Sequence, residues 1–288
     1  MLKYDVVNVF ADRAFAGNPL AVVHGAGDLD AAAMQTIARE FNLSETAFPL
    51  PPSSGRADYR VRFFTPLTEL PFAGHPSVGT AWVLARDGVI ASGEVVQECA
   101  AGLMPVVVDA AGAVVTGGTP RVGALLDGAE LAAAVGLDPV DVDPSAPAGI
   151  AEAGLPFAYL PVRPDAVSRA AVAARAALRT PTHHFTGVVV LHHDAQARTA
   201  HVRIFGPGID VDEDPATGSA AVGLGVWLVD RGRLPADGRS ELTISQGAEI
   251  GRPSRLELTV EASAGAAIRT SVGGRVVPIA HGQITPPP

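Results

Sequence analysis

The chain has 288 residues, of which 48% are hydrophobic and 18% are charged, a composition typical of packed globular proteins rather than disordered ones. The formal net charge of −9 argues against a nucleic-acid binder, because an acidic chain with scattered arginines cannot neutralise phosphates in bulk. Cys99 is the single cysteine, which excludes an intramolecular disulfide and a cysteine-rich zinc site.

Two further properties of the sequence suggest where the protein works. Residues 1–5 lack the apolar segment of a signal peptide, and no apolar run is long enough to span a bilayer. We therefore expect a cytoplasmic enzyme that does not associate with membranes. The length fits two domains, each large enough to have its own core.

Short strands and two helices are predicted in the first half. Residues 4–10 and 20–23 are β-rich, and Asp30 can cap a helix that ends near Asn42. Residues 59–64 predict another strand. Pro76 suits the first turn of the next helix, over residues 77–86, which is apolar on almost every side. A helix of this kind is expected to be buried.

The second half continues with strands, peripheral helices and a second apolar helix. A glycine-rich linker over residues 117–120 leads into it, and residues 220–229 repeat the buried-helix pattern. Peripheral helices are expected over residues 125–135 and 165–178. The predicted strands cover residues 105–110, 114–116, 158–162, 187–192, 255–261 and 273–280.

The two halves of the sequence resemble each other. Val61–Pro66 reads VRFFTP and Val202–Pro207 reads VRIFGP, and each copy leads through a turn of small residues into an apolar stretch with a tryptophan. The copies are 141 residues apart at their arginines and 145 apart at Trp82 and Trp227. This repeat predicts two related domains with a site in the cleft between them.

The expected fold is therefore α+β, with two pseudo-symmetric domains. Each would be a curved, mostly antiparallel, barrel-like sheet around a buried central helix. We place the first domain at residues 1–118 and the second at residues 119–274, with a strand from about 275–288 returning to the first.

Glu45 is the first candidate for chemistry. It lies between the first predicted helix and an apolar strand, where partial burial would favour the neutral form of its carboxyl group. A carboxylic acid tuned in this way can both donate and accept a proton. The alternative is a glutamate that caps an element or is simply solvated.

The start of each buried helix supplies further candidates. Gly74 lets the backbone approach a ligand, and His75 can orient a bound group or move a proton. Asp214 and Ser219 stand at the second helix start, where Asp214 could hold a substrate amine or hydroxyl and Ser219 a carboxylate. The free N–H groups of both helix starts suit an anion. The alternative is that His75, Asp214 and Ser219 are ordinary helix caps.

Metal and nucleotide sites receive little support. Five histidines between residues 183 and 201 are candidate metal ligands: His183, His184, His192, His193 and His201. Adjacent histidines in a strand point to opposite faces, so they cannot bind one ion together. No carboxylate lies at a ligand-like spacing from them, and no glycine-rich phosphate loop occurs. We expect no metal and no cofactor.

At these residues the chain resembles the PhzF family of phenazine-biosynthesis isomerase-like proteins, which have the diaminopimelate epimerase fold. The resemblance covers essentially the whole chain, and five ordered motifs with suitable spacing carry it. It is seen in FAGNP (residues 15–19), NLSETAF (42–48), RFFTP (62–66), AGHP (73–76) and EDPATGSA (213–220), with QG (246–247) and GRPS (251–254) near the end.

The resemblance implies a reaction and a set of residues. The family's founding activity is isomerisation of trans-2,3-dihydro-3-hydroxyanthranilate without metal or coenzyme, in secondary metabolism. Its proton-moving glutamate corresponds to Glu45, and the supporting side chains correspond to His75, Asp214 and Ser219. Backbone contacts to the small carboxylate substrate would come from the glycines before the histidine and the serine, Gly74 and Gly218. A homodimer is also implied.

The same residues are compatible with two alternative functions. The first is an epimerase or racemase that uses Glu45 and one other base, and the second is a non-catalytic protein that binds a small carboxylate. Sister enzymes that use two cysteines, one on each face of the substrate carbon, are not a suitable comparison, because Cys99 stands alone and lies outside both helix starts.

Overall fold

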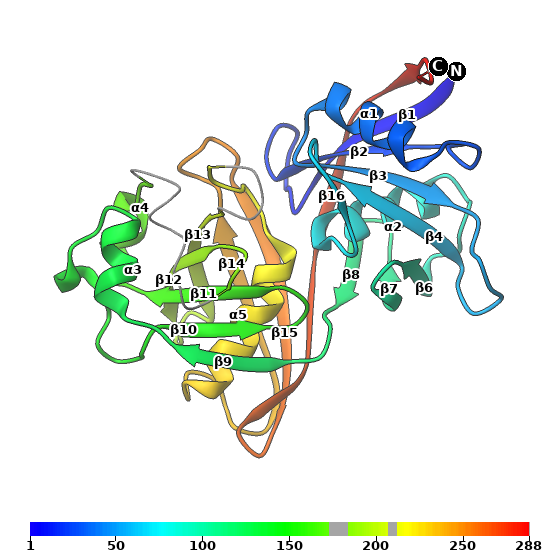
Figure 1. The fold of residues 1–288 in the computed structure, drawn as a ribbon. Coiled ribbons are helices and arrows are strands. Elements are labelled where there is room, and N and C mark those ends of the chain that lie inside the picture. Colours follow the sequence, from blue (N-terminus) through cyan, green and yellow to red (C-terminus); the bar gives the residue numbers. More distant parts are fainter. Residues whose placement is uncertain (173–183, 207–211, 288) are drawn as a thin grey trace. The chain divides into compact units, whose positions relative to one another are not determined.

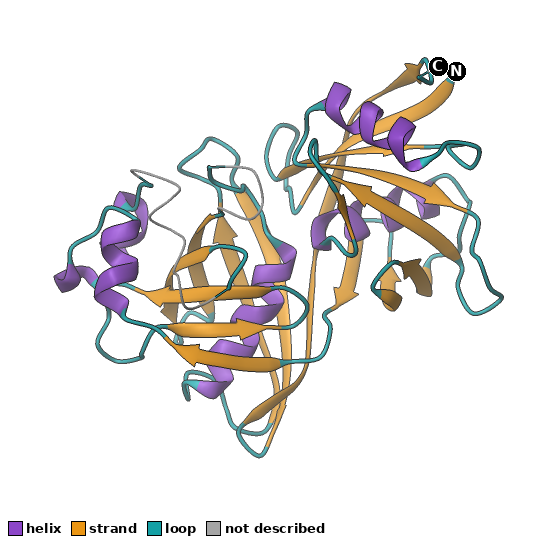
Figure 2. Ribbon diagram, in the orientation of Figure 1, coloured by secondary structure: helices purple, strands orange, loops and turns teal. Residues whose placement is uncertain are grey.

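The computed structural model describes residues 1–172, 184–206 and 212–287 (Figure 1). These residues divide into two compact units. The first consists of Met1–Thr116 together with Gly273–Pro288, and the second of Gly117–Val272. Strands dominate both units and each has a few helices, as Figure 2 shows.

The sheet of the first unit closes on itself. Its strand order is β1-β2-β3-β4-β6-β7-β8-β16, and β1 also pairs with β16, so eight strands form a barrel. Parallel pairing occurs where a helix connects the strands, between β2 and β3 and between β4 and β6. The strands are β1 (Leu2–Val9), β2 (Asn18–Val23), β3 (Glu45–Leu50), β4 (Tyr59–Phe64), β5 (Glu69–Leu70), β6 (Gly93–Cys99), β7 (Gly102–Val108), β8 (Gly112–Thr116) and β16 (Ala266–Ile284).

The first unit has two helices, one packed against the barrel and one surrounded by its strands. Helix α1 (Ala31–Phe41) is amphipathic and packs its apolar face, including Met34 and Ile37, on Phe48 and neighbouring strand residues. Helix α2 (Gly74–Arg86) is buried along nearly its whole length, as its apolar sequence predicts. At Gly79 an added Cβ would lie 2.6 Å from Leu20 Cδ2, so glycine allows α2 to approach the strands closely.

The sheet of the second unit repeats this order of elements. Its strand order is β16-β15-β14-β13-β12-β11-β10-β9, and the parallel pairs β11–β12 and β13–β14 again flank helices. The strands are β9 (Arg121–Leu125), β10 (Gly149–Glu152), β11 (Pro156–Pro161), β12 (Val188–Asp194), β13 (Thr199–Phe205), β14 (Gly238–Gln246) and β15 (Ser254–Ser263).

Helix α5 (Gly218–Asp230) is the buried helix of the second unit and corresponds to α2. Tyr159 of β11 turns toward it and donates its hydroxyl to the Ala220 carbonyl at 2.8 Å. The shorter helices are α3 (Gly128–Ala134), the 3₁₀ helix η1 (Pro139–Asp141) and α4 (Pro164–Arg169).

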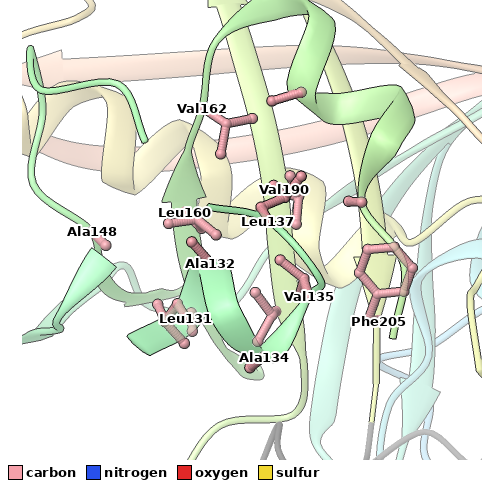
Figure 3. Close-up of a cluster of buried hydrophobic side chains, with 14 of the residues drawn as sticks. Leu131, Ala132, Ala134, Val135, Leu137, Ala148, Leu160, Val162, Val190 and Phe205 are labelled. Carbon is pink, nitrogen blue, oxygen red and sulfur yellow. The ribbon is translucent and has the colours of Figure 1, made fainter. Parts of the chain in front are cut away.

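The other face of β11 forms a second core, drawn in Figure 3. Leu160 packs there with Leu131 of α3, with Val135 at the C-cap of that helix, and with Val190 of β12 and Phe205 of β13. Because successive strand residues point to opposite faces, β11 is buried on both sides, which explains its almost continuous apolar sequence.

The structure confirms the predicted fold class, α+β with mostly antiparallel curved sheets around buried helices. Some predicted boundaries were wrong. Leu125 ends a strand instead of starting a helix, because Asp127 caps the helix that begins at Gly128. The helix predicted over residues 165–178 is observed as Pro164–Arg169, and residues 173–178 lie outside the described residues.

Within the described residues, no helix combines the length and the apolar character that crossing a bilayer requires.

Candidate active site

Glu45 is the first residue of β3 and stands at a sharp change of chain direction. Helix α1 ends at Phe41, and Asn42 adopts a left-handed conformation with φ of 49°, which lets the chain turn into the strand. The Ser44 hydroxyl donates to Asn18 Oδ1 at 2.9 Å and fixes the turn. The Glu45 side chain is 17% exposed, so its carboxyl group is mostly shielded from water.

The carboxyl group of Glu45 faces the start of α2. His75, the second residue of that helix, is buried, and its Nε2 lies 3.4 Å from Glu45 Oε2. Gly74 is the first helical residue, so its backbone lies immediately beside the pair. The structure therefore brings together three residues that the sequence proposed for one site.

The protonation state of His75 decides what this contact means. Burial lowers the pKa of His75 to about 3, and a contact with the Pro19 backbone carbonyl opposes this shift. The imidazole is therefore neutral near pH 7, and the contact is not an ion pair. Because Nε2 faces Glu45, we assign the ring hydrogen to Nδ1, where the Pro19 carbonyl can accept it.

This tautomer leaves a lone pair on Nε2 directed at the Glu45 carboxyl group. The contact is favourable when that carboxyl group carries a proton, so the two groups can hold one proton between them. A separation of 3.4 Å is long for a hydrogen bond, and such contacts often shorten when substrate binds. The pair has the chemistry of a general acid/base with a neutral partner.

A buried chain of hydrogen bonds holds the start of α2 in place. The Tyr59 hydroxyl donates to Gln97 Oε1 at 3.0 Å, and Gln97 Nε2 donates to Ser77 Oγ at 2.9 Å. Ser77 Oγ then donates to the Ala73 carbonyl at 2.7 Å. The strand residues Tyr59 and Gln97 thus fix the helix turn that carries His75.

In the second unit, the remaining predicted residues gather at the start of α5. Gly218 is the first helical residue, and Ser219 and Asp214 are buried. The backbone N–H of Asp214 donates to the Ile204 carbonyl at 3.1 Å, which ties the loop to β13. Asp214 and Ser219 are not N-caps, because Thr217 occupies that position.

The side chains that hold Asp214 were not identified from the sequence. Thr217 Oγ1 donates to Asp214 Oδ2, and Gln246 Nε2 donates to the Asp214 backbone carbonyl at 2.7 Å. Ser254 Oγ donates to the Pro215 carbonyl at 2.8 Å. All three of Thr217, Gln246 and Ser254 lie inside the motifs that carry the family resemblance. Their position in those motifs is the sequence feature that could have identified them.

A buried ion pair supports the same loop. Arg203 donates from Nε and a terminal nitrogen to the two carboxylate oxygens of Glu213, at 2.8 and 2.6 Å. Its other terminal nitrogen donates to backbone carbonyls at the end of α4, including those of Ser168 and Ala170. Since Glu213 precedes Asp214, Arg203 anchors the loop to α4.

The structure thus places the predicted residues in two groups. Glu45, Gly74 and His75 lie together in the first unit, and Asp214, Gly218 and Ser219 belong to one loop and helix start in the second. That both groups act on one substrate stays a prediction.

The histidines weighed as metal ligands do not form such a site in the described residues. His192 and His193 point to opposite sides of β12, and His201 pairs with Glu249 at 2.9 Å. His183 lies outside the described residues. Another group, Asp5, His24 and Asp87, has ligand atoms within 4.8 Å of one another.

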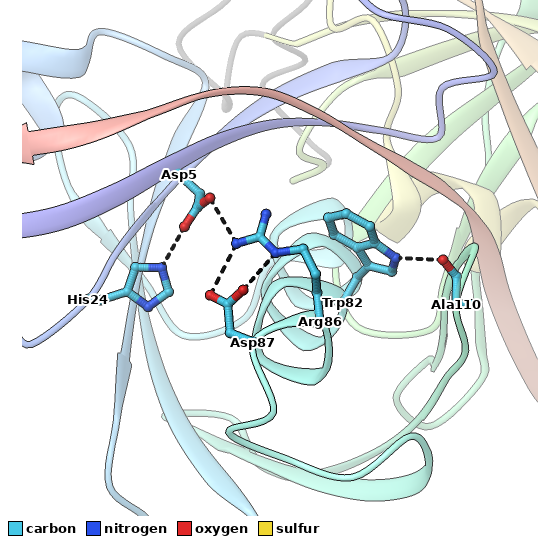
Figure 4. A network of polar contacts seen from close by, with 6 residues as sticks. All are labelled: Asp5, His24, Trp82, Arg86, Asp87 and Ala110. Atoms are coloured by element: carbon cyan, nitrogen blue, oxygen red, sulfur yellow. Dashed lines mark hydrogen bonds and ion pairs between the residues drawn. The ribbon is translucent and has the colours of Figure 1, made fainter.

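Arg86 already supplies the positive charge at that group, as Figure 4 shows. Its guanidinium donates to Asp5 Oδ1 at 2.9 Å and to Asp87 Oδ1 at 2.7 Å, while His24 Nε2 lies 2.9 Å from Asp5 Oδ2. The two carboxylates share the single positive charge of Arg86 and are both hydrogen-bonded, so the cluster is best explained as a network that ties β1 to the end of α2.

Comparison with known proteins gives one consistent family. The model of the PhzC-PhzF family, described as phenazine biosynthesis-like protein, matches residues 7–282. A protein of Mesorhizobium japonicum named uncharacterized isomerase mll1393 is 36% identical, over 98% of each chain. The trans-2,3-dihydro-3-hydroxyanthranilate isomerase of Pseudomonas aeruginosa is 33% identical, over 98% of this chain and 99% of its own.

Solved structures agree with these relatives. A PhzF-family protein of Bacillus anthracis superposes with a TM-score of 0.87 at 24% identity, covering 99% of both chains. A probable proline racemase from Agrobacterium radiobacter has a TM-score of 0.69 at 14% identity, over 99% of this chain and 93% of its own, which shows a shared fold alone. The chain belongs to the PhzC-PhzF family, an isomerase family with the diaminopimelate epimerase-like fold.

Proposed function

We propose that the protein is a PhzF-type isomerase that moves a proton, and with it a double bond, within a small unsaturated cyclic amino acid or carboxylate. Trans-2,3-dihydro-3-hydroxyanthranilate, the compound in the name of the Pseudomonas aeruginosa relative, is the first substrate to test. Glu45 is the general acid/base. The reaction as proposed uses no metal and no coenzyme.

The contact between Glu45 and His75 is the observation that carries this proposal. A shielded carboxyl group 3.4 Å from a neutral imidazole can receive a proton from carbon and return it at another position. A fixed neutral partner suits this role, because it stabilises the protonated carboxyl group without adding a charge.

The other residues are assigned to binding and orientation. His75 and Asp214 would orient the substrate, and Asp214 would pair with an amine or hydroxyl group. Ser219 and the backbone N–H groups near Gly74 and Gly218 would hold the substrate carboxylate, which the positive ends of the helix dipoles favour. The family resemblance further suggests a homodimer, which sedimentation analysis would test.

A racemase mechanism with two thiols has no support in this chain. Cys99 is the single cysteine, and it lies at the end of β6, away from both helix starts in the sequence. Burial raises the pKa of the Cys99 thiol, which disfavours the reactive thiolate. A single carboxylic acid fits a proton shift within one molecule better.

The test is incubation with trans-2,3-dihydro-3-hydroxyanthranilate in D₂O, with the ring protons followed by NMR. We expect conversion by the wild type and a loss of about 10² to 10⁴-fold in Glu45→Gln. Glu40→Gln is the matched control, since Glu40 lies exposed on α1 and the substitution is chemically the same. Full turnover by Glu45→Gln would refute the assignment of the base.

The same experiment separates the alternatives. An epimerase would introduce solvent deuterium while leaving the position of the double bond unchanged. A binding protein would hold the compound without any proton exchange. If a panel of unsaturated cyclic carboxylates also gave neither exchange nor conversion, the proposed isomerase activity would have to be abandoned.

A further inference from the structure

The orientation of the Gln246 side-chain amide is fixed by two backbone groups. Its Oε1 accepts a hydrogen bond from the Thr217 backbone N–H at 3.1 Å, and its Nε2 donates to the Asp214 backbone carbonyl at 2.7 Å. A backbone N–H only donates and a carbonyl only accepts, so rotating the amide by 180° would lose both bonds. The amide therefore has one allowed orientation.

This orientation determines where the Thr217 hydroxyl hydrogen points. Gln246 Nε2 also donates to Thr217 Oγ1 at 3.2 Å, so the hydroxyl oxygen is an acceptor on that side. In the part of the chain that the structure describes, Asp214 Oδ2 is the acceptor within reach of this hydroxyl. The hydroxyl hydrogen is therefore directed at the Asp214 carboxylate.

The hydrogen bond from Thr217 to Asp214 replaces the usual capping hydrogen bond at the N-terminus of α5. Thr217 is the N-cap residue, a position where threonine ordinarily accepts a hydrogen bond from the first turn of the helix. No such side-chain cap is formed here. The hydroxyl is used on Asp214 instead, and the three side chains Asp214, Thr217 and Gln246 are all buried.

We propose that Thr217 and Gln246 are positioning residues that keep Asp214 as an ionised hydrogen-bond acceptor. This inference rests on the proposed function and deepens it. Asp214 then receives an N–H or O–H hydrogen from the substrate and does not supply a proton. The substrate group that meets Asp214 is accordingly an amine or a hydroxyl, which can donate such a hydrogen.

The first unit contains a matched arrangement with a different target. Gln97 Nε2 donates to the Ser77 hydroxyl on the first turns of α2, and that hydroxyl donates to the Ala73 backbone carbonyl. A glutamine from a strand thus orients a hydroxyl in both units. In the first unit the hydroxyl donates its hydrogen to a backbone carbonyl, and in the second it donates its hydrogen to a carboxylate.

A substitution at Thr217 alters none of the charged side chains next to Asp214 in the chain or on the turn before β15. Asp212 and Glu213 precede it in the chain, and Glu213 is neutralised by Arg203 of β13. Arg252 belongs to the turn before β15, and Glu249 pairs with His201. A difference between wild type and a Thr217 variant therefore reports the hydroxyl and not these groups.

The test is a pH titration of the Asp214 carboxyl carbon by NMR in protein labelled with ¹³C-aspartate, with Asp214→Asn to assign the signal. In Thr217→Val, we expect the titration midpoint to move to higher pH by about one unit, because a hydrogen bond to the ionised form is lost. Thr217→Ser should restore the wild-type midpoint. Ser77→Ala, the matched control from the first unit, should leave it unchanged.

An unchanged midpoint in Thr217→Val would overturn the inference. If that variant does not fold, the wild type alone decides: an Asp214 signal at the chemical shift of a protonated carboxyl group at pH 7 would also overturn it. Neither reading depends on turnover, so a failure of the proposed isomerase activity would be recognised separately. Where turnover is measurable, Thr217→Val should move the acidic limb of kcat/KM to higher pH, and Thr217→Ser should restore it.

Discussion

The two units contain the same local side-chain interactions, but these differ in their exposure to solvent. In each unit, a strand arginine donates two hydrogen bonds to one glutamate carboxylate and lies over a phenylalanine ring. In the first unit these residues are Arg62, Glu69 and Phe64. In the second unit they are Arg203, Glu213 and Phe205. The first pair is 27% and 36% exposed, whereas the second is 8% and 9% exposed. The same sequence pattern therefore gives a surface ion pair in one unit and a buried one in the other.

The largest expected difference between the units comes from breaking the buried pair. Arg203→Met leaves the Glu213 carboxylate without its partner in a shielded position and removes the bonds to the end of α4. We expect a loss of about 3 to 5 kcal/mol in the free energy of unfolding of the second unit, measured by urea denaturation. A loss below 1 kcal/mol would show that Glu213 is well solvated after all.

A second expected difference concerns acid stability. The folded pKa of His75 is about 3 and its unfolded pKa is 6.5, so between these values the unfolded chain binds a proton that the folded chain does not. The stability that neutral His75 contributes is complete above pH 6.5 and is lost as pH falls toward 3. At about pH 4.5 the loss should be about 2 to 3 kcal/mol.

The matched variants are His75→Gln and His193→Gln, since burial also lowers the pKa of His193 in the second unit. We expect His75→Gln to flatten the decline of unfolding free energy between pH 7 and 4.5 more than His193→Gln does. Equal slopes in both variants would mean that burial lowers the pKa of His75 no more than that of His193, which would contradict the value of about 3.

The glycines of the two buried helices provide a smaller contrast. An alanine at Gly79 would press on Leu20 Cδ2, the end of a flexible side chain, and on the Val9 methyl group Cγ2. An alanine at Gly223 would press on the rigid Tyr159 hydroxyl and displace it from the Ala220 carbonyl. We expect Gly223→Ala to cost about 2 to 3 kcal/mol and Gly79→Ala about 1 kcal/mol, by thermal or urea unfolding. The reverse order would contradict this explanation.

The smallest effect is expected for the exposed pair of the first unit. Arg62→Met should change the free energy of unfolding by less than about 1 kcal/mol, because water screens both partners. Added salt should reduce even this difference, whereas the Arg203→Met effect should persist. A loss comparable to that of Arg203→Met would remove the distinction between the two units.

Elements with a clear residue pattern could be predicted from the sequence. The buried helices were recognised because their apolar residues surround the axis, and the end of α1 because Asn42 follows its apolar face. Strand β9 was missed, because its residues are exposed and carry no alternation of apolar and polar side chains. The tail strand begins at Ala266 and is longer than predicted, since pairing partners far away in the chain determine its length.

The candidate site was only partly predictable. Glu45 and His75 are 30 positions apart in the chain, and their contact depends on β3 starting where α2 begins, which single-sequence patterns do not specify. The roles of Thr217 and Gln246 depend on the direction of each hydrogen bond. Such directions are set by tertiary packing, so residue types alone could not assign them.

Strand β16 has a consequence for how the protein is synthesised. Its residues after Val272 pair with β1 and complete the barrel of the first unit, although the whole second unit separates them from β8 in the chain. At a ribosomal rate of about 5 to 20 residues per second, roughly 15 to 50 s pass between the synthesis of β1 and the synthesis of its partner strand. During that time the nascent first unit has two unpaired strand edges, so the unit made first is the one that finishes folding last.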